Sequence, residues 1–166
     1  ISVFLTRGYG GLKKGPLEVK NSHHFQDVGD ESILLSKVGT TIVSRNRCLG
    51  AKFIEKHNYK FDVIIMDDGL QNYQLKQDIK FLLIDKHLKL GNGFCLPAGP
   101  LRQSLNRGLT NIDKIILTGE NNKDDKGLFK SFNIPVIETN IRITNLPKIK
   151  KEKLLAFCGI ANPKKF

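Results

Sequence analysis

The stretch Val-Ile-Ile-Met-Asp-Asp-Gly-Leu-Gln at residues 63–71 decides the fold of this chain. Its first four residues form an apolar run of strand length, and two adjacent carboxylates follow at once. A strand that is apolar on both faces is typical of a parallel sheet covered by helices. Open α/β sheets bind ligands at the carboxyl ends of such strands. The stretch therefore predicts a buried central strand that carries Asp67 and Asp68 to a binding edge.

Other strand-length runs recur along the chain with helical or loop segments between them. The runs are residues 2–6, 41–43, 81–85, 114–117, 135–139 and 154–158. Helices are predicted at residues 30–38, where Asp30 can cap the first turn, and at residues 45–56. Residues 87–109 are punctuated by glycine and proline, so we expect a long ordered loop there. This order predicts one α/β domain over residues 1–166 with a layered, mostly parallel sheet.

The charge of the chain favours an anionic partner. The 166 residues include 27 Lys and Arg against 16 Asp and Glu, a formal net charge of +11. Anionic lipid, a phosphorylated substrate and nucleic acid all fit this charge, but the basic residues are scattered and aromatic residues make up only 8%, so we expect no nucleic acid partner. Three widely spaced cysteines without a metal-binding pattern are typical of a reduced cytoplasmic setting.

The acidic residues of two segments allow both a functional and a purely structural interpretation. Asp67 and Asp68 could hold Mg²⁺ or its waters, as carboxylates at this position do in nucleotide-phosphate enzymes, or they could form a turn and a helix cap. Asp30 and Glu31 stand at a helix start, where the helix dipole and capping favour acidic residues. A carboxylate there could also accept a proton from an attacking hydroxyl.

Two further segments combine cations with glycine. Residues 6–11, Thr-Arg-Gly-Tyr-Gly-Gly, follow a strand and offer a guanidinium and a flexible backbone, which suit phosphate, although such a segment is more often an ordinary turn. It is not a Walker A loop, because GxxxxGK followed by Ser or Thr is missing. Residues 91–102 form a partly apolar loop that ends in Arg102, an arrangement suited to an anionic group on an otherwise apolar substrate.

Taken in this order, the segments resemble the tetraacyldisaccharide 4'-kinase family. The resemblance rests on the strings RGYG (7–10), GDE (29–31), DDGLQ (67–71), GNG with LPAGPLR (91–102) and AFCGIANP (156–163). It implies a P-loop-type fold and transfer of the ATP γ-phosphate, with Mg²⁺, to the 4'-hydroxyl of an acylated glucosamine disaccharide 1-phosphate in lipid A biosynthesis. It also implies a peripheral position on the cytoplasmic face of the bacterial inner membrane, with the membrane surface as a partner.

The resemblance implies a role for each site residue. Asp30 corresponds to the catalytic aspartate of the family, and Asp67 and Asp68 serve the metal and the phosphates. The residues implied to contact substrate or phosphate are Arg7, Tyr9, Glu31, Arg47, Gln71 and Arg102.

The chain also departs from the family pattern. Family members carry a Walker A loop upstream of residue 7 and a DHH segment beyond residue 163, and neither motif occurs in these 166 residues. Ser32, Asn72 and Gln103 stand where Pro, His and Glu are usual. We therefore expect a kinase core that is incomplete at both ends and inactive alone, or one completed by a separate chain that carries the P-loop. The alternative is a non-catalytic α/β module that binds an anionic lipid or a phosphorylated ligand.

Overall fold

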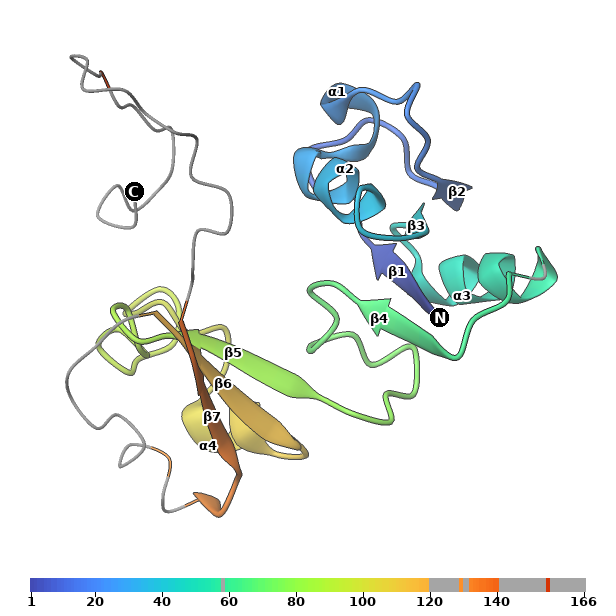
Figure 1. The fold of residues 1–166 in the computed structure, drawn as a ribbon. Helices are drawn as coiled ribbons and strands as arrows, with labels where there is room; N and C mark the ends of the chain where they lie inside the picture. Colours follow the sequence, from blue (N-terminus) through green and yellow to red (C-terminus); the bar gives the residue numbers. More distant parts are fainter. Residues whose placement is uncertain (58, 120–128, 130–131, 141–154, 156–166) are drawn as a thin grey trace, which may run out of the picture.

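The computed structural model describes residues 1–57, 59–119, 129, 132–140 and 155. Figure 1 shows the elements in space, and their bounds in chain order are β1 (Ser2–Thr6), β2 (Leu17–Glu18), α1 (Phe25–Val28), α2 (Asp30–Ser36), β3 (Thr41–Val43), α3 (Arg47–Lys56), β4 (Val63–Met66), β5 (Phe81–Asp85), α4 (Leu105–Leu109), β6 (Lys114–Thr118) and β7 (Val136–Thr139). No helix within the described residues is long and apolar enough to cross a membrane.

The strands of the described residues form two sheets. The first has four strands in the order β2-β3-β1-β4, and the second has three in the order β5-β6-β7 (Figure 1). All pairs are parallel except the pairing of β2 with β3. The predicted α/β fold with mostly parallel strands is confirmed and is consistent with a P-loop-type layered fold, but we expected one sheet where the described strands form two.

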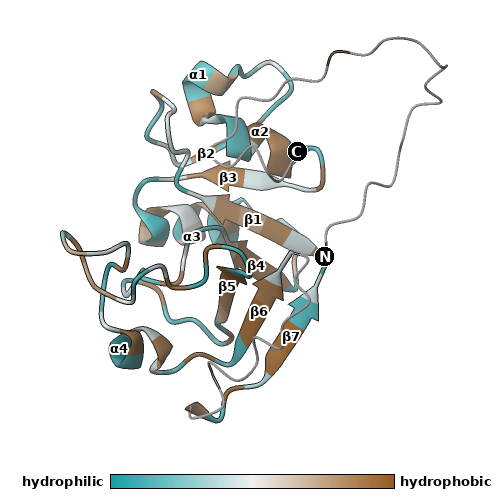
Figure 2. Ribbon diagram, turned by 90° about the vertical axis from the view of Figure 1, so that its left-hand side faces the viewer, coloured by the Kyte–Doolittle hydropathy of each residue, from teal (hydrophilic) through white to brown (hydrophobic). Residues whose placement is uncertain are grey.

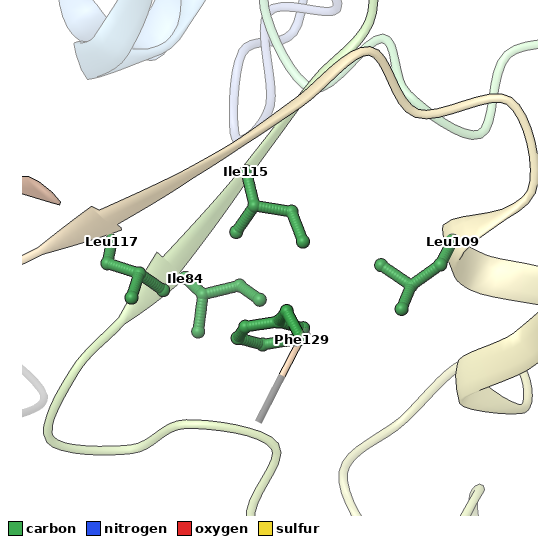
Figure 3. Close-up of a cluster of buried hydrophobic side chains, with 5 residues drawn as sticks. All are labelled: Ile84, Leu109, Ile115, Leu117 and Phe129. Carbon is green, nitrogen blue, oxygen red and sulfur yellow. The ribbon is translucent and has the colours of Figure 1, made fainter. Parts of the chain in front are cut away.

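Each sheet has its own hydrophobic core. In the four-stranded sheet, residues of β1, β3 and α3 form one buried cluster of Val3, Leu5, Ile42 and Ile54, and a second cluster joins Val19, Val28 and Val43. In the three-stranded sheet, Figure 3 shows the buried cluster of Ile84, Leu109, Ile115, Leu117 and Phe129. These clusters share no residue, so each sheet has its own set of buried apolar contacts.

The prediction that residues 63–66 form a buried central strand is wrong. β4 is the edge strand of the four-stranded sheet and pairs only with β1 among the described strands. Val63 and Ile65 lie on one face of it and are 49% and 43% exposed. Figure 2 shows hydrophobic residues along β4 and along β5, the edge strand of the other sheet. An apolar sequence cannot distinguish a central strand from an apolar edge strand, because pairing and coverage come from distant segments.

The positions of most other elements agree with the sequence analysis. The predicted bounds of β1, β3, β4 and β5 are confirmed, whereas the helix predicted from residue 45 begins at Arg47. Asn46 caps it, accepting a hydrogen bond from Leu49 N at 3.1 Å. The predicted loop at 87–109 contains α4 at its end, and β2 and α1 are too short to have been predicted. The strand predicted at residues 154–158 lies outside the described residues except for residue 155.

Candidate functional site

The carboxyl ends of three parallel strands meet at one edge of the four-stranded sheet. Thr6 ends β1 and stands in register with Val43, the last residue of β3. Leu5 stands in register with Met66, the last residue of β4, so Asp67 follows directly beside Thr6. The structure therefore brings residues distant in sequence to the edge at which ligands bind in α/β sheets.

Asp67 is half-buried and is held by three hydrogen bonds. Its backbone N–H donates to Leu5 O at 3.1 Å, and its carbonyl accepts from Arg47 Nη2 at 3.0 Å. Its carboxylate oxygen Oδ2 accepts from the Thr6 hydroxyl at 3.1 Å. Two of these partners belong to β1 and one to α3, so tertiary packing sets the position of this carboxylate.

Asp68 turns the chain away from the sheet. Its φ is +50°, in the left-handed region that Asp tolerates better than most residues, and its side chain is exposed. Gly69 is buried next to it, and a Cβ at that position would lie 2.5 Å from Met66 Cβ. Only glycine fits this close approach, as the predicted sharp turn after the two carboxylates requires.

Arg47 lies beneath this edge and is only 4% exposed. Its Nη1 donates to Ser44 O at 2.8 Å and its Nη2 to Asp67 O, while Nε has no hydrogen-bond partner. Burial lowers the pKa of the Arg47 guanidinium, and the negative charge of Asp67 opposes this shift. The role implied for Arg47 was contact with substrate or phosphate. In this structure both of its terminal nitrogens instead bond to the backbone.

The backbone of the loop after β1 packs against the backbone at the junction between α1 and α2. Gly8 has φ +68°, and a Cβ there would lie 2.9 Å from Val28 O. Gly29, with φ +86°, would place a Cβ 2.3 Å from Tyr9 O. This contact brings the Arg-Gly-Tyr-Gly segment beside the Gly-Asp-Glu segment, and the side chains of Arg7 and Tyr9 remain exposed.

Asp30 and Glu31 are the first two residues of α2. Gly29, not Asp30, occupies the N-cap position, and no side-chain capping bond is present, so the capping interpretation of Asp30 is wrong. Glu31 is exposed, yet partial desolvation and the negative charges of Asp67, Asp68 and Asp30 raise the pKa of its carboxyl group. The carboxylates of Asp30, Asp67 and Asp68 therefore lie close enough to Glu31 to affect its titration.

The turn after β4 also contacts the loop that follows β5. Arg102 Nη1 donates to Gln71 Oε1 at 3.2 Å, and both side chains are exposed. Asn92 closes the same loop by donating from Nδ2 to Ala98 O at 2.8 Å and by accepting from Phe94 N at 3.1 Å. The structure thus places Gln71 and Arg102 together, as members of a hydrogen-bonded loop.

Carboxylate oxygens suit Mg²⁺, the metal that the sequence pattern favours. Hard oxygen donors fit Mg²⁺, which keeps several waters and needs few protein ligands. Within the described ranges, no group of three or more His, Cys, Asp or Glu side chains is arranged to hold a metal ion. Asp67 and Asp68 together could supply two carboxylates, so the chemistry of the donors fits Mg²⁺ even though they form no complete protein cage.

Sequence analysis did not identify Thr6 as a site residue. Its hydroxyl is buried, with 2% of the residue exposed, and it contacts the Asp67 carboxylate across 61 positions of sequence. The available signal was its place as the last residue of a predicted parallel strand. That signal was not sufficient, because the neighbouring strand could not be identified from sequence.

The comparisons with known proteins point first to a class, the families named as kinases, and then to one family within it. A sequence model described as "Tetraacyldisaccharide-1-P 4'-kinase" matches residues 2–166 of the chain. The chain belongs to this tetraacyldisaccharide 4'-kinase family.

Curated relatives carry the same name and are longer. The chain is 39% identical to the tetraacyldisaccharide 4'-kinase of Parvibaculum lavamentivorans, over 98% of this chain and 48% of the relative. It is 36% identical to that of Allorhizobium ampelinum over 98% and 48%, and 37% identical to that of Rickettsia bellii over 99% and 50%. The chain thus spans about half the length of these relatives. No solved structure matches it significantly.

Proposed function

We propose that this chain supplies the acceptor and metal side of a kinase that transfers the γ-phosphate of ATP to the 4'-hydroxyl of tetraacyldisaccharide 1-phosphate in lipid A biosynthesis. Family membership supports the kinase class and the named substrate. The single structural observation that supports this site is that the end of β4, which carries Asp67 and Asp68, lies beside the end of β1, whose following loop packs against Gly29 just before Asp30 and Glu31.

In this proposal the sugar hydroxyl attacks the γ-phosphorus. A bond forms between the 4'-oxygen and phosphorus, the bond to the bridging oxygen of ADP breaks, and Asp30 accepts the hydroxyl proton. Asp67 and Asp68 would hold Mg²⁺, which neutralises charge on the phosphates when bound. Partial desolvation and the negative charges of the three aspartates raise the pKa of Glu31, and a bound cation would offset that repulsion.

The exposed cations and the loop after β5 suit the acyl and phosphate groups of the ligand. Arg102 lies at the end of a loop that exposes Phe94 and Leu96, at 64% and 67%. Arg7 and Tyr9 are exposed on the loop after β1, and Gln71 is bonded to Arg102. We assign these four polar residues and Glu31 to substrate or phosphate contact.

We further propose a peripheral position on the cytoplasmic face of the inner membrane, because the substrate is a lipid and the net charge is +11. Sedimentation with anionic vesicles at physiological salt tests this position. Binding to neutral and anionic vesicles alike would argue against an electrostatic contribution.

The transfer reaction is tested in a chimera in which residues 2–166 replace the matching segment of the Parvibaculum lavamentivorans kinase. With ATP, Mg²⁺ and tetraacyldisaccharide 1-phosphate, we expect 4'-phosphorylation. Asp30→Asn should lower kcat by ~10²–10⁴-fold, the usual contribution of a general base, while Mg²⁺-ATP still binds. Asp62→Asn, at an exposed position before β4, is the matched control and should leave kcat unchanged. A folded chimera without transfer activity would refute the proposal, and an active Asp30→Asn variant would refute the role of Asp30.

A further inference from the structure

Thr6 has the geometry of a residue that orients a carboxylate. It is the last residue of β1, and its buried Oγ1 donates to Asp67 Oδ2 at 3.1 Å. A β-branched side chain has few χ1 rotamers, and a hydrogen bond to a charged acceptor is stronger than a neutral one. The hydroxyl is therefore a stiff donor that occupies one oxygen of the Asp67 carboxylate.

Arg47 holds the backbone of the same aspartate. Its planar fork joins two carbonyls, Ser44 O after β3 and Asp67 O after β4, at 2.8 and 3.0 Å. A lysine ammonium is a point charge without this fork geometry. Because the guanidinium is buried and both terminal nitrogens are occupied, its contacts fix the positions of two strand ends relative to each other.

We infer that Thr6 is a positioning residue for the Asp67 carboxylate and that Arg47 is a positioning residue for the Asp67 backbone. Together with the bond from Asp67 N to Leu5 O, they fix this aspartate at its side chain, its carbonyl and its amide. Neither residue needs to contact substrate for this role. The positioning of Asp67 by Thr6 and Arg47 does not depend on the proposed function. Only the role of the positioned Asp67 rests on it.

The Thr6 part is tested by the side-chain conformation of Asp67 in the full 166-residue chain. Three-bond couplings from Asp67 Cγ to its backbone N and carbonyl carbon report the χ1 rotamer by NMR. We expect a single rotamer in the wild type and in Thr6→Ser, which keeps the hydroxyl, and averaged couplings in Thr6→Val, which keeps the shape and loses the donor. A single unchanged rotamer in Thr6→Val would overturn the inference.

The Arg47 part is tested with Arg47→Lys and the same labelled protein. Loss of the guanidinium bond should shift the carbonyl ¹³C resonance of Asp67 upfield, while amides at the paired starts of β1 and β4 keep their positions and report that the four-stranded sheet persists. An unchanged Asp67 carbonyl resonance would overturn the assignment of Arg47.

A Mn²⁺ titration, read as paramagnetic broadening at Asp67 and Asp68, separates this inference from the proposed function. Residues that support a metal ligand typically contribute 10–100-fold in affinity. Thr6→Val should therefore need 10–100-fold more Mn²⁺ than the wild type, and Thr6→Ser should restore binding. If Thr6→Val binds as the wild type does, positioning by Thr6 is wrong. If the wild type shows no broadening, the metal role of Asp67 fails, and the rotamer measurement still decides the role of Thr6.

Discussion

The two sheets place an aspartate at the end of an apolar strand in two different ways. Asp85 ends β5, and its Oδ1 accepts the backbone N–H groups of His87 at 2.8 Å and Leu88 at 3.2 Å, which closes a local turn. Asp67 follows β4, and its Oδ2 accepts a hydroxyl from a different strand. The same sequence pattern thus yields a turn in one sheet and a carboxylate held by tertiary contacts in the other.

The sheets also differ in how charge is compensated at their carboxyl ends. Lys86, which follows β5, is buried and pairs with Glu138 of β7 at 2.9 Å. Near the end of β4, partial desolvation and the negative charges of the neighbouring aspartates raise the pKa of Glu31, and the buried Arg47 guanidinium balances part of that charge. Internal pairing makes the first edge a structural feature, whereas the repulsion at the second edge makes it suited to a cationic ligand.

Matched core substitutions should show whether the sheets are separate stability units. Leu5 and Leu117 are 0% and 1% exposed in different clusters, so Leu5→Ala and Leu117→Ala should each cost about 2–5 kcal/mol. Hydrogen exchange should show faster opening mainly in the sheet that carries the substitution. Equal acceleration in both sheets by either variant would show that they unfold as one unit.

A pair of glycines distinguishes the crowded loop of the first sheet from the open loop of the second. Gly29 and Gly93 both have positive φ, but a Cβ at Gly29 would lie 2.3 Å from Tyr9 O, and one at Gly93 would meet nothing within 4 Å. Gly93→Ala should cost about 1 kcal/mol for the backbone conformation alone. Gly29→Ala adds a clash with Tyr9 O to this cost, so it should lower the free energy of urea unfolding by at least about 2–3 kcal/mol. Equal costs would contradict the close packing of the two site segments.

Removing one charge should cost more stability at the end of the three-stranded sheet than at the end of β4. Glu138→Gln leaves the Lys86 ammonium buried without its charged partner and should cost about 1–2 kcal/mol, a reduced value because Glu138 is itself 37% exposed. Asp67→Asn keeps an oxygen that can accept from Thr6, relieves the repulsion on Glu31 and removes a charge that favours the Arg47 guanidinium. Because these effects oppose one another, its stability should stay within about 0.5 kcal/mol of the wild type at pH 7. If Asp67→Asn lowers the free energy of unfolding as much as Glu138→Gln does, the expected difference between the two edges is wrong.

The smallest expected effect is on the titration of Glu31. Its pKa is raised above the ordinary 4.5, so the folded state binds more protons than the unfolded state just above that pH, and stability falls as pH rises through this window. Asp67→Asn removes a like charge and should lower the pKa of Glu31, as followed by carboxyl ¹³C NMR. Asp85→Asn in the other sheet is the control and should leave it unchanged. If Asp67→Asn leaves the pKa of Glu31 unchanged, the two carboxylates do not interact.

The bounds of several strands and the family could be predicted from local sequence. The apolar runs gave the bounds of β1, β3, β4 and β5, because strand formation depends on residues next to one another. The ordered motifs gave the family, which the comparisons confirm. The roles of Asp30, Asp67 and Asp68 remain proposals.

Only the tertiary structure decided which strands pair and which side chains are buried. It placed β4 at an edge, buried Arg47 against two backbone carbonyls, and brought Thr6 to Asp67. The sequence by itself determined the bounds of β1, β3, β4 and β5 and the chemistry of the side chains at their ends. It could not determine which strand ends are neighbours, because contacts between strand ends join residues far apart, such as Thr6 and Asp67 at 61 positions, and the side chains carry no local sign of their partners.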